Sequence, residues 1–304
     1  MNKKGLHINV IGCEWNHHLE GAGWYDVCAR LKNEFLDSRS SIDCFTAYEY
    51  QVRKKVTKPF IAFFHQVVSN YERSLKNIFH SELWIHNKQY FLGGFVFSDY
   101  QKKYLKSIDC DKNIHLVMHP TKMNVRRWSF TQYMQKQNFL HVGIHCRNIN
   151  FFLNVARRRK NTDHYLMIAV RNEDYEMNIT ACKKSGVELV KRLDSHAYQT
   201  ALASSIVFIN LIDAAANNTI LECIARGTPI LINDVGGVKE YVGEDYPLLY
   251  SDMSHAQHMI DVIKKNPIIL KKTHQHLLSL RHKYTNKQFI SSVRDTLTMI
   301  TDRI

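Results

Sequence analysis

The sequence predicts an α/β protein made of two halves, each a parallel sheet with helices packed on it. Short apolar runs rich in β-branched residues, such as 206–209, recur along the chain and lead into polar or glycine-containing loops. Stretches with apolar residues at helical spacing follow these loops, as in 24–35 and 219–226. At 304 residues the chain is long enough for two domains of ordinary size.

Composition predicts a globular protein that works in the cytoplasm. The hydrophobic share of 45% and the charged share of 23% are typical of chains that bury full cores. No run approaches the roughly 20 apolar residues of a membrane span. The first strand begins so early that a signal peptide is not expected. Seven cysteines are scattered without a Cys-x-x-Cys pair, which is typical of reduced thiols.

The net charge of +13 suits an anionic partner, although solubility alone also explains it. A nucleotide diphosphate, an anionic membrane face and nucleic acid all fit the sign of the charge. The densest basic run, 157–160, closes a predicted helix, where cations favour the helix dipole. No RNA-binding, zinc-finger or helix-turn-helix spacing is present, so nucleic acid is not expected.

The first half alternates predicted strands and helices. The expected strands are Leu6 to Gly12, Ile42 to Thr46, Pro59 to Phe64, Glu82 to His86 and Gly94 to Phe97. The expected helices cover Trp24 to Phe35, about Val67 to Phe79, and a stretch capped by Ser98. Titratable side chains cluster in and after the glycine-rich loop 12–23, where a ligand is expected at the carboxyl edge of the sheet: Glu14, His17, His18 and Asp26. Lone histidines are more often structural, so both interpretations stay open.

The second half follows a polar, basic linker at about 121–137. Its expected strands are Phe139 to Gly143, His164 to Val170, Val187 to Val190 and Ile206 to Asn210. Gly143 and Arg147 follow the first of these strands, and Lys191 and Arg192 follow the third. A guanidinium there suits a phosphate, because it forms charge-assisted, bidentate hydrogen bonds.

The stretch 206–250 carries the strongest local pattern. A strand meets a polar loop, a helix over Thr219 to Arg226, a terminating Gly227 and a second strand at 230–232. Thr219 and Glu222 fit a capping box, in which both side chains serve the helix start. The same helix start suits a ligand phosphate. Three helical stretches then follow, at about 254–265, 267–283 and 286–300.

A resemblance carries the prediction further. The order ANNTILECIARGTPILIN, GGVKEYVG and YPLLY resembles the nucleotide-sugar-binding half of GT-B glycosyltransferases, especially family 4-like enzymes of bacterial and large-virus polysaccharide clusters. Glu222, Gly227 and Pro229 match the second part of the Glu-x7-Glu helix motif. The first glutamate of that motif would fall at Ala214, and Asp213 is its neighbour.

The resemblance implies a fold and an activity. The fold would be α/β of the GT-B type, with Rossmann-like domains at 1–125 and 138–304 facing across a cleft, and C-terminal helices. The activity would be metal-independent transfer of a sugar from a nucleotide-diphosphate donor, UDP- or GDP-linked, to a glycan, lipid-linked or other acceptor. It would serve polysaccharide or glycoconjugate synthesis, with peripheral contact to an anionic membrane.

The resemblance also implies residue roles. Glu222 would hold the nucleotide ribose. The diphosphate would lie against Gly143, Arg147, Lys191, Arg192, Asn217, Asn218 and Thr219. A catalytic base, where the reaction needs one, would come from Asp26, Glu14, His17 or His18. No cofactor and no metal are expected, and Asp109 with Asp111 is interpreted as a solvated turn despite its metal-binding spacing.

Two other classes stay open. A nucleotide-sugar epimerase or hydrolase would use the same fold for different chemistry. A non-catalytic protein that binds nucleic acid or glycan would keep the fold alone, and Ala214 in place of the glutamate favours this class.

Overall fold

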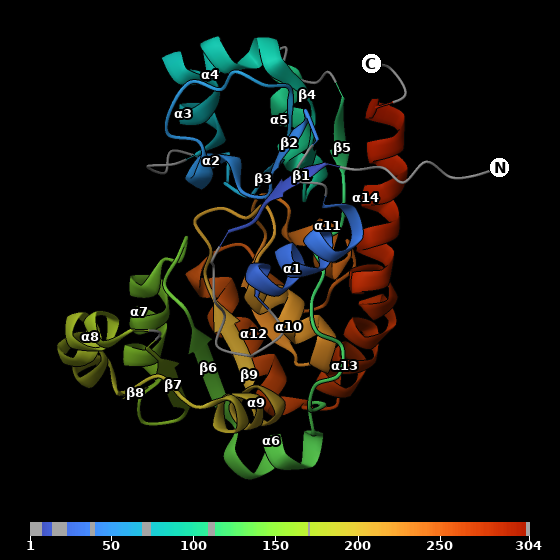
Figure 1. Cartoon of the computed structure of the whole chain (residues 1–304). Coiled ribbons are helices and arrows are strands. Elements are labelled where there is room, and N and C mark those ends of the chain that lie inside the picture. Colours follow the sequence, from blue (N-terminus) through green and yellow to red (C-terminus); the bar gives the residue numbers. More distant parts are fainter. Residues whose placement is uncertain are drawn as a thin grey trace. The chain divides into compact units, whose positions relative to one another are not determined.

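The computed structural model describes residues 8–13, 23–36, 40–68, 74–108, 113–169 and 171–301. These residues form two compact units, and Figure 1 labels most of their elements. Unit 1 takes its described residues from Met1–His17, Gly21–Pro120 and Lys283–Ile304, and unit 2 from Thr121–His282. The second domain expected from the sequence runs to residue 304, whereas residues from Lys283 onward group with unit 1.

Unit 1 contains a five-stranded parallel sheet in the order β1-β2-β3-β4-β5. The central β3 is buried along its whole length, as its run of aromatic and aliphatic residues predicts. The strands are β1 (Asn9–Ile11), β2 (Asp43–Phe45), β3 (Phe60–Phe64), β4 (Phe91–Val96) and β5 (Ile114–Leu116).

Helices connect these strands and close unit 1. They are α1 (Trp24–Phe35), α2 (Tyr48–Gln51), α3 (Leu75–Phe79), α4 (Glu82–Asn87), the 3-10 turn η1 (Lys88–Tyr90), α5 (Asp99–Ser107) and the last helix α14 (Asn286–Thr301). Phe289 of α14 packs its ring against Trp24, and Arg294 pairs with Glu34. These contacts tie the last helix to α1, far away in the sequence.

One expected strand of unit 1 is a helix. Glu82 to His86 is predicted as a strand, but it forms α4. Ser81 decides the conformation, since its hydroxyl accepts a hydrogen bond from Trp84 N and caps the helix. Trp84 then fits a core of aromatic rings and lies 4.4 Å from the ring of Phe79.

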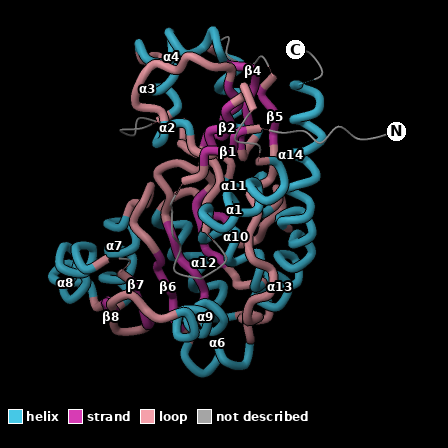
Figure 2. Tube along the Cα trace, in the orientation of Figure 1, coloured by secondary structure: helices cyan, strands magenta, loops and turns pink. Residues whose placement is uncertain are grey.

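Unit 2 contains a six-stranded parallel sheet in the order β11-β10-β9-β6-β7-β8. Figure 2 shows its strands in magenta and the intervening helices in cyan. The strands are β6 (Asn138–Val142), β7 (His164–Ile168), β8 (Val187–Val190), β9 (Ile206–Ile209), β10 (Ile230–Asn233) and β11 (Leu249–Tyr250). The two parallel α/β sheets confirm the predicted fold class.

The helices of unit 2 include one that lies in the expected linker. They are α6 (Phe130–Lys136), α7 (Ile149–Arg159), α8 (Asn172–Ser185), α9 (Ser195–Ser204), α10 (Asn218–Arg226), α11 (Val238–Val242), α12 (Met253–Lys265) and α13 (Ile269–Leu280), followed by the 3-10 turn η2 (Arg281–Tyr284). The linker prediction missed α6, which Ser129 caps through its hydroxyl. Gly227 ends α10 as predicted, in a left-handed conformation with φ +71°.

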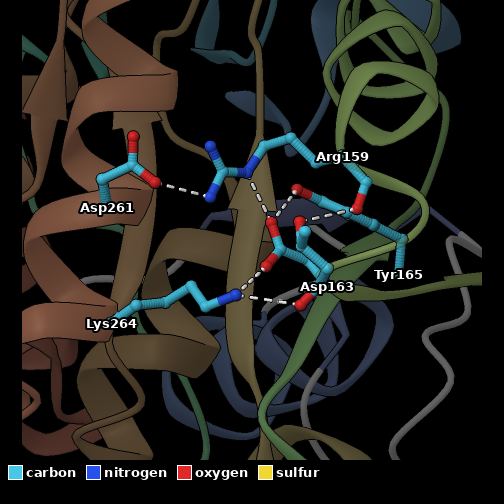
Figure 3. A network of polar contacts seen from close by, with 6 residues as sticks. Arg159, Asp163, Tyr165, Asp261 and Lys264 are labelled. Atoms are coloured by element: carbon cyan, nitrogen blue, oxygen red, sulfur yellow. Dashed lines mark hydrogen bonds and ion pairs between the residues drawn. The ribbon is translucent and has the colours of Figure 1, made fainter.

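Charged side chains join α7 to α12 around Asp163 (Figure 3). The Asp163 carboxylate, 1% exposed, accepts hydrogen bonds from Arg159 and Lys264. Arg159 also reaches Asp261 on α12, with Nη2 at 2.7 Å from Oδ1. The basic end of α7 therefore does more than favour the helix dipole, because Arg159 holds a neighbouring helix in place.

Candidate functional site

The sheet of unit 2 changes direction between β6 and β9. The chain moves outward from β6 to β7 and β8, and then in the opposite direction from β9 to β10 and β11. Ligands of open α/β sheets bind at the carboxyl ends of strands beside such a reversal. The loops after β6 and β9 are joined there by backbone hydrogen bonds of 2.9 Å. One runs from Asn148 N to Asn210 O, the other from Ile212 N to Cys146 O.

Arg147 reaches from the loop after β6 to the start of α10. Its Nη2 donates to Thr219 Oγ1 at 2.8 Å and to Asn217 Oδ1 at 3.4 Å. Its buried Nε has no hydrogen-bond partner among the described residues. Burial lowers the pKa of Arg147 to about 10, so the guanidinium stays protonated at neutral pH. The strand reversal therefore holds a fixed positive charge.

Gly143 gives this guanidinium its room. Gly143 has φ +77°, a left-handed conformation that favours glycine. A Cβ atom at this position would lie 3.1 Å from Arg147 Cζ, tighter than an ordinary contact. The structure thus brings together Gly143, Arg147, Asn217 and Thr219 at one edge of the sheet.

The start of α10 differs from the predicted capping box. Asn217 is the cap, because its Oδ1 accepts from Thr219 N at 3.0 Å and from Ile220 N at 3.4 Å. The helix begins at Asn218, so Glu222 lies too deep in it to reach back to the cap. The capping-box prediction is wrong, since an asparagine two residues earlier is the stronger N-cap. The exposed Asn218 begins the helix, and its backbone N–H has no acceptor within the helix.

Glu222 lies inside unit 2 with two polar neighbours. It is 2% exposed, and its Oε2 accepts a hydrogen bond of 2.8 Å from the Tyr198 hydroxyl of α9. Its Oε1 lies 3.8 Å from Nη1 of Arg226, which is fully buried. The sequence did not single out Tyr198 or Arg226. Glu222 and Arg226 stand four residues apart on one helix, a spacing that allows an ion pair, but no local pattern shows that Tyr198 meets Glu222 from another helix.

Ala214 leaves no ionisable group at the position of the family's first glutamate. Ala214 is buried, and so is its neighbour Asp213, whose Oδ1 accepts from Ala214 N at 2.7 Å. Gly236 approaches from the turn after β10, so closely that a Cβ there would lie 2.5 Å from Asp213 Oδ1. The Asp213 carboxylate therefore lies where the loops after β9 and β10 meet.

Lys191 and Arg192 follow β8 at the edge of the sheet, two strands from β6. Both side chains are exposed. Lys191 Nζ lies 5.2 Å from the centre of the Tyr175 ring. Within the described part of the chain, neither residue forms a hydrogen bond with Arg147 or with the start of α10.

One of the four catalytic candidates, Asp26, lies in the first turn of α1. Asp26 Oδ2 accepts from Gly23 N at 3.3 Å, so this carboxylate serves the helix start. Glu14, His17 and His18 lie outside the described residues, as do Asp109 and Asp111. Among the described residues, no group of three or more His, Cys, Asp or Glu side chains is arranged to hold a metal ion.

A buried carboxylate that the sequence did not suggest holds the loop after β3. Glu49 is 5% exposed, and its Oε1 accepts from the backbone N–H groups of His65 and Gln66. Its Oε2 has no hydrogen-bond partner in the described part of the chain. Burial raises the pKa of Glu49 to about 7 despite these donors. Burial, together with the charge of His119, lowers the pKa of His65 to about 3, so His65 is neutral at physiological pH.

A cavity of about 240 Å³ lies at the opposite end of the unit 2 sheet. Gln137 and His164, which stand at the starts of β6 and β7, line it together with Lys136 and Lys264. Lys264 already pairs with Asp163. This cavity is therefore separate from the strand reversal, because the two lie at opposite ends of the same strands.

Solved structures of known proteins share this fold. The chain is similar to sucrose-phosphate synthase from Thermosynechococcus elongatus over 91% of its own length and 76% of that chain, with 13% identity and a TM-score of 0.65. It is similar to the Anabaena protein HepE in complex with UDP and glucose over 90% and 81%, with 10% identity and a TM-score of 0.66. The likeness to TarM spans 84% of this chain but only 54% of TarM, with 14% identity and a TM-score of 0.64.

No protein-family model matches the sequence, and no curated protein matches it either. The structural likenesses and the two parallel sheets establish a fold of the GT-B glycosyltransferase type, as the resemblance implied. Membership of family 4 stays a prediction. No helix among the described residues combines the length and the apolar character needed to cross a bilayer.

Proposed function

We propose that this protein is a glycosyltransferase that moves a sugar from a nucleotide-diphosphate donor to an acceptor hydroxyl. One observation carries the proposal: Arg147 and the start of α10 meet at the strand reversal, with Arg147 Nη2 at 2.8 Å from Thr219 Oγ1. A guanidinium beside a helix N-terminus is a strong anion site, because both supply N–H donors and positive charge. A diphosphate fits this combination.

The proposed chemistry follows from that charge. The bond between the sugar anomeric carbon and the donor phosphate oxygen breaks, and the acceptor oxygen bonds to the same carbon. Negative charge grows on the departing nucleoside diphosphate, and Arg147 and the α10 N-terminus stabilise it in the transition state. Gly143 leaves room for close approach, and Asn217, Asn218 and Thr219 present the helix start. Lys191 and Arg192 add positive charge along the same edge.

Glu222 is proposed to accept hydrogen bonds from the donor ribose, as the resemblance implies. The donor is a nucleotide sugar. UDP is the first nucleotide to test, because HepE was solved with UDP and glucose. The acceptor proton passes to the departing phosphate in a retaining reaction, or to a base in an inverting one. For that base, Glu14, His17 and His18 remain proposals, and Asp26 would have to exchange its bond to Gly23 N.

A panel of nucleotide diphosphates and nucleotide sugars tests the proposal. A ligand that binds only the folded protein raises its melting temperature by mass action. We expect UDP-linked or GDP-linked sugars to raise it, and slow release of free nucleoside diphosphate when no acceptor is present. Isomerised donor would instead identify an epimerase.

Ala214 favours one second candidate, a binding protein that keeps the fold without the chemistry. Its signature is salt-dependent binding of nucleic acid or glycan with no affinity for any nucleotide sugar. That combination would overturn the proposed transferase.

A further inference from the structure

Glu222 is one member of a buried line of charged and polar groups. Arg226 lies one helical turn beyond it on α10, and its Nη1 donates to Glu222 O at 3.2 Å besides facing the carboxylate. Tyr198 approaches from α9 and donates its hydroxyl to Oε2. Glu222 also belongs to the same helix as Thr219, which accepts from Arg147 at the strand reversal. The line therefore connects the interior of unit 2 with the proposed diphosphate site.

Stability alone gives no reason for this arrangement. Arg226 is 0% exposed, and its Nε and Nη2 have no hydrogen-bond partner among the described residues. Burying a charged pair costs desolvation that its attraction often fails to recover, so apolar residues of similar size are commonly as stable. A carboxylate fixed in one orientation is, however, what selective recognition of sugar hydroxyls requires.

We propose that Tyr198 and Arg226 are positioning residues that hold the Glu222 carboxylate for the hydroxyls of the donor ribose. The inference rests on the proposed function. A carboxylate accepts about four hydrogen bonds, and the Tyr198 hydroxyl uses one of these sites. The hydroxyl of the rigid Tyr198 ring orients Oε2 of Glu222, and Arg226 Nη1 faces the other oxygen, Oε1, from 3.8 Å. The selectivity for ribose over deoxyribose therefore depends on residues that do not touch the ligand.

The experiment compares UDP with 2′-deoxy-UDP, or GDP with its 2′-deoxy form if GDP binds more tightly. Calorimetry gives both affinities for the unchanged protein and for Tyr198→Phe, which removes only the hydroxyl. We expect the unchanged protein to prefer the ribose form by about tenfold or more, since a hydrogen bond to a charged group contributes that much. Tyr198→Phe should reduce this preference to less than about threefold.

Thr228→Val is the matched control. The buried Thr228 hydroxyl donates to Leu202 O of α9 at 2.9 Å, so it also joins α9 to the segment after α10, through a hydrogen bond that does not involve Glu222. We expect this variant to keep the preference for ribose. If the loss of any buried hydroxyl disturbed the fold, Tyr198→Phe and Thr228→Val would both lose affinity. Each would then lose it equally for the ribose and the 2′-deoxy nucleotide.

A double-mutant cycle shows whether Tyr198 acts through Glu222. In a Glu222→Gln background, which itself should weaken UDP binding tenfold or more, Tyr198→Phe should have no further effect on the ribose preference. If Tyr198→Phe does not fold, Arg226→Lys replaces it, because it keeps the charge but loses the geometry of the guanidinium.

The outcomes separate the two proposals. An unchanged protein that prefers ribose, with Tyr198→Phe or Arg226→Lys preferring it equally, overturns the positioning role and leaves the transferase intact. A protein that binds no nucleoside diphosphate overturns both. A loss of preference in Thr228→Val as large as in Tyr198→Phe also contradicts the positioning role.

Discussion

One buried ionisable residue places a charge at the edge of each sheet. Arg147 places a cation at the strand reversal of unit 2, and Glu49 places a carboxylate under the loop after β3 in unit 1. Each leaves one buried atom without a hydrogen-bond partner among the described residues, Nε in Arg147 and Oε2 in Glu49. Arg147 stays protonated at neutral pH, whereas burial raises the pKa of Glu49 to about 7. The stability of unit 1 should therefore respond to the ionisation of Glu49.

Glu49→Gln should change the pH dependence of stability in a defined direction. The pKa of Glu49 rises from its ordinary value of 4.5 to about 7 on folding, chiefly through burial. The folded protein therefore binds this proton more tightly than the unfolded chain, and ionisation costs stability as pH rises from about 4.5 through 7. Glutamine has no charge to bury. The free energy of unfolding of the variant, relative to that of the unchanged protein, should therefore rise by on the order of 3 kcal/mol between pH 4.5 and 8.5.

Urea unfolding of both proteins across this range, followed by tryptophan fluorescence, measures the difference. Other titrating groups cancel in the comparison because both proteins contain them. A stability difference that stays constant from pH 4.5 to 8.5 would show that Glu49 ionises as it does in water.

At the scale of elements, the network between α7 and α12 joins one cation, Arg159, to one buried and one exposed carboxylate. Arg159 pairs with Asp163, which is 1% exposed, and with Asp261, which is 51% exposed. Burial opposes the ionised form of Asp163, but bonds from Lys264 and Arg159 lower its pKa below the usual value. Its contribution is therefore present at neutral pH and is lost as pH falls into the acid range.

Asp163→Asn should destabilise the protein at neutral pH by about 2–4 kcal/mol, because Arg159 and Lys264 lose a shielded partner. Asp261→Asn should cost less than about 1 kcal/mol, since exposed pairs are screened by water and salt. Thermal unfolding of the two variants gives the comparison. Equal effects would mean that the network is no stronger than an ordinary surface pair.

Helices and strands were predicted correctly where the spacing of apolar residues in the sequence agreed with the residues that are buried in the structure. The all-apolar β3 and the β9–α10–β10 unit were predicted, because buried parallel strands and a helix ended by glycine leave distinct patterns. The strand prediction for Glu82 to His86 was wrong, because a short apolar run is ambiguous between strand and helix until its serine cap is considered. The short α6 was missed for a different reason, because its polar residues show no strong helical periodicity.

The site was predictable only in part. Gly143, Arg147, Asn217 and Thr219 followed from their positions after parallel strands. Tyr198 and Glu49 could not be found this way, because their partners lie far along the chain. A hydrogen bond between α9 and α10 depends on how two helices pack, which no local spacing encodes.

At the scale of the whole molecule, the proposed catalysis needs no tightly held divalent metal. Arg147 and the α10 N-terminus supply positive charge for the departing diphosphate, the role that a metal has in other transferases. Donor hydrolysis or transfer should therefore continue in saturating EDTA at the rate seen with magnesium or manganese. Loss of turnover in EDTA that metal restores, with Asp109→Asn and Asp111→Asn equally inactive, would contradict this expectation.

The central claim is that Arg147 binds the diphosphate of a nucleotide at the strand reversal of unit 2. Calorimetric titration of the unchanged protein and of Arg147→Ala, with UDP and uridine and with GDP and guanosine, tests it most directly. Circular dichroism serves as the folding control. We expect the variant to lose about ten- to a hundredfold in affinity for the diphosphate, as charge-assisted hydrogen bonds imply, and less than about threefold for the nucleoside. Equal losses for both ligands would make Arg147 a structural residue and would contradict the claim.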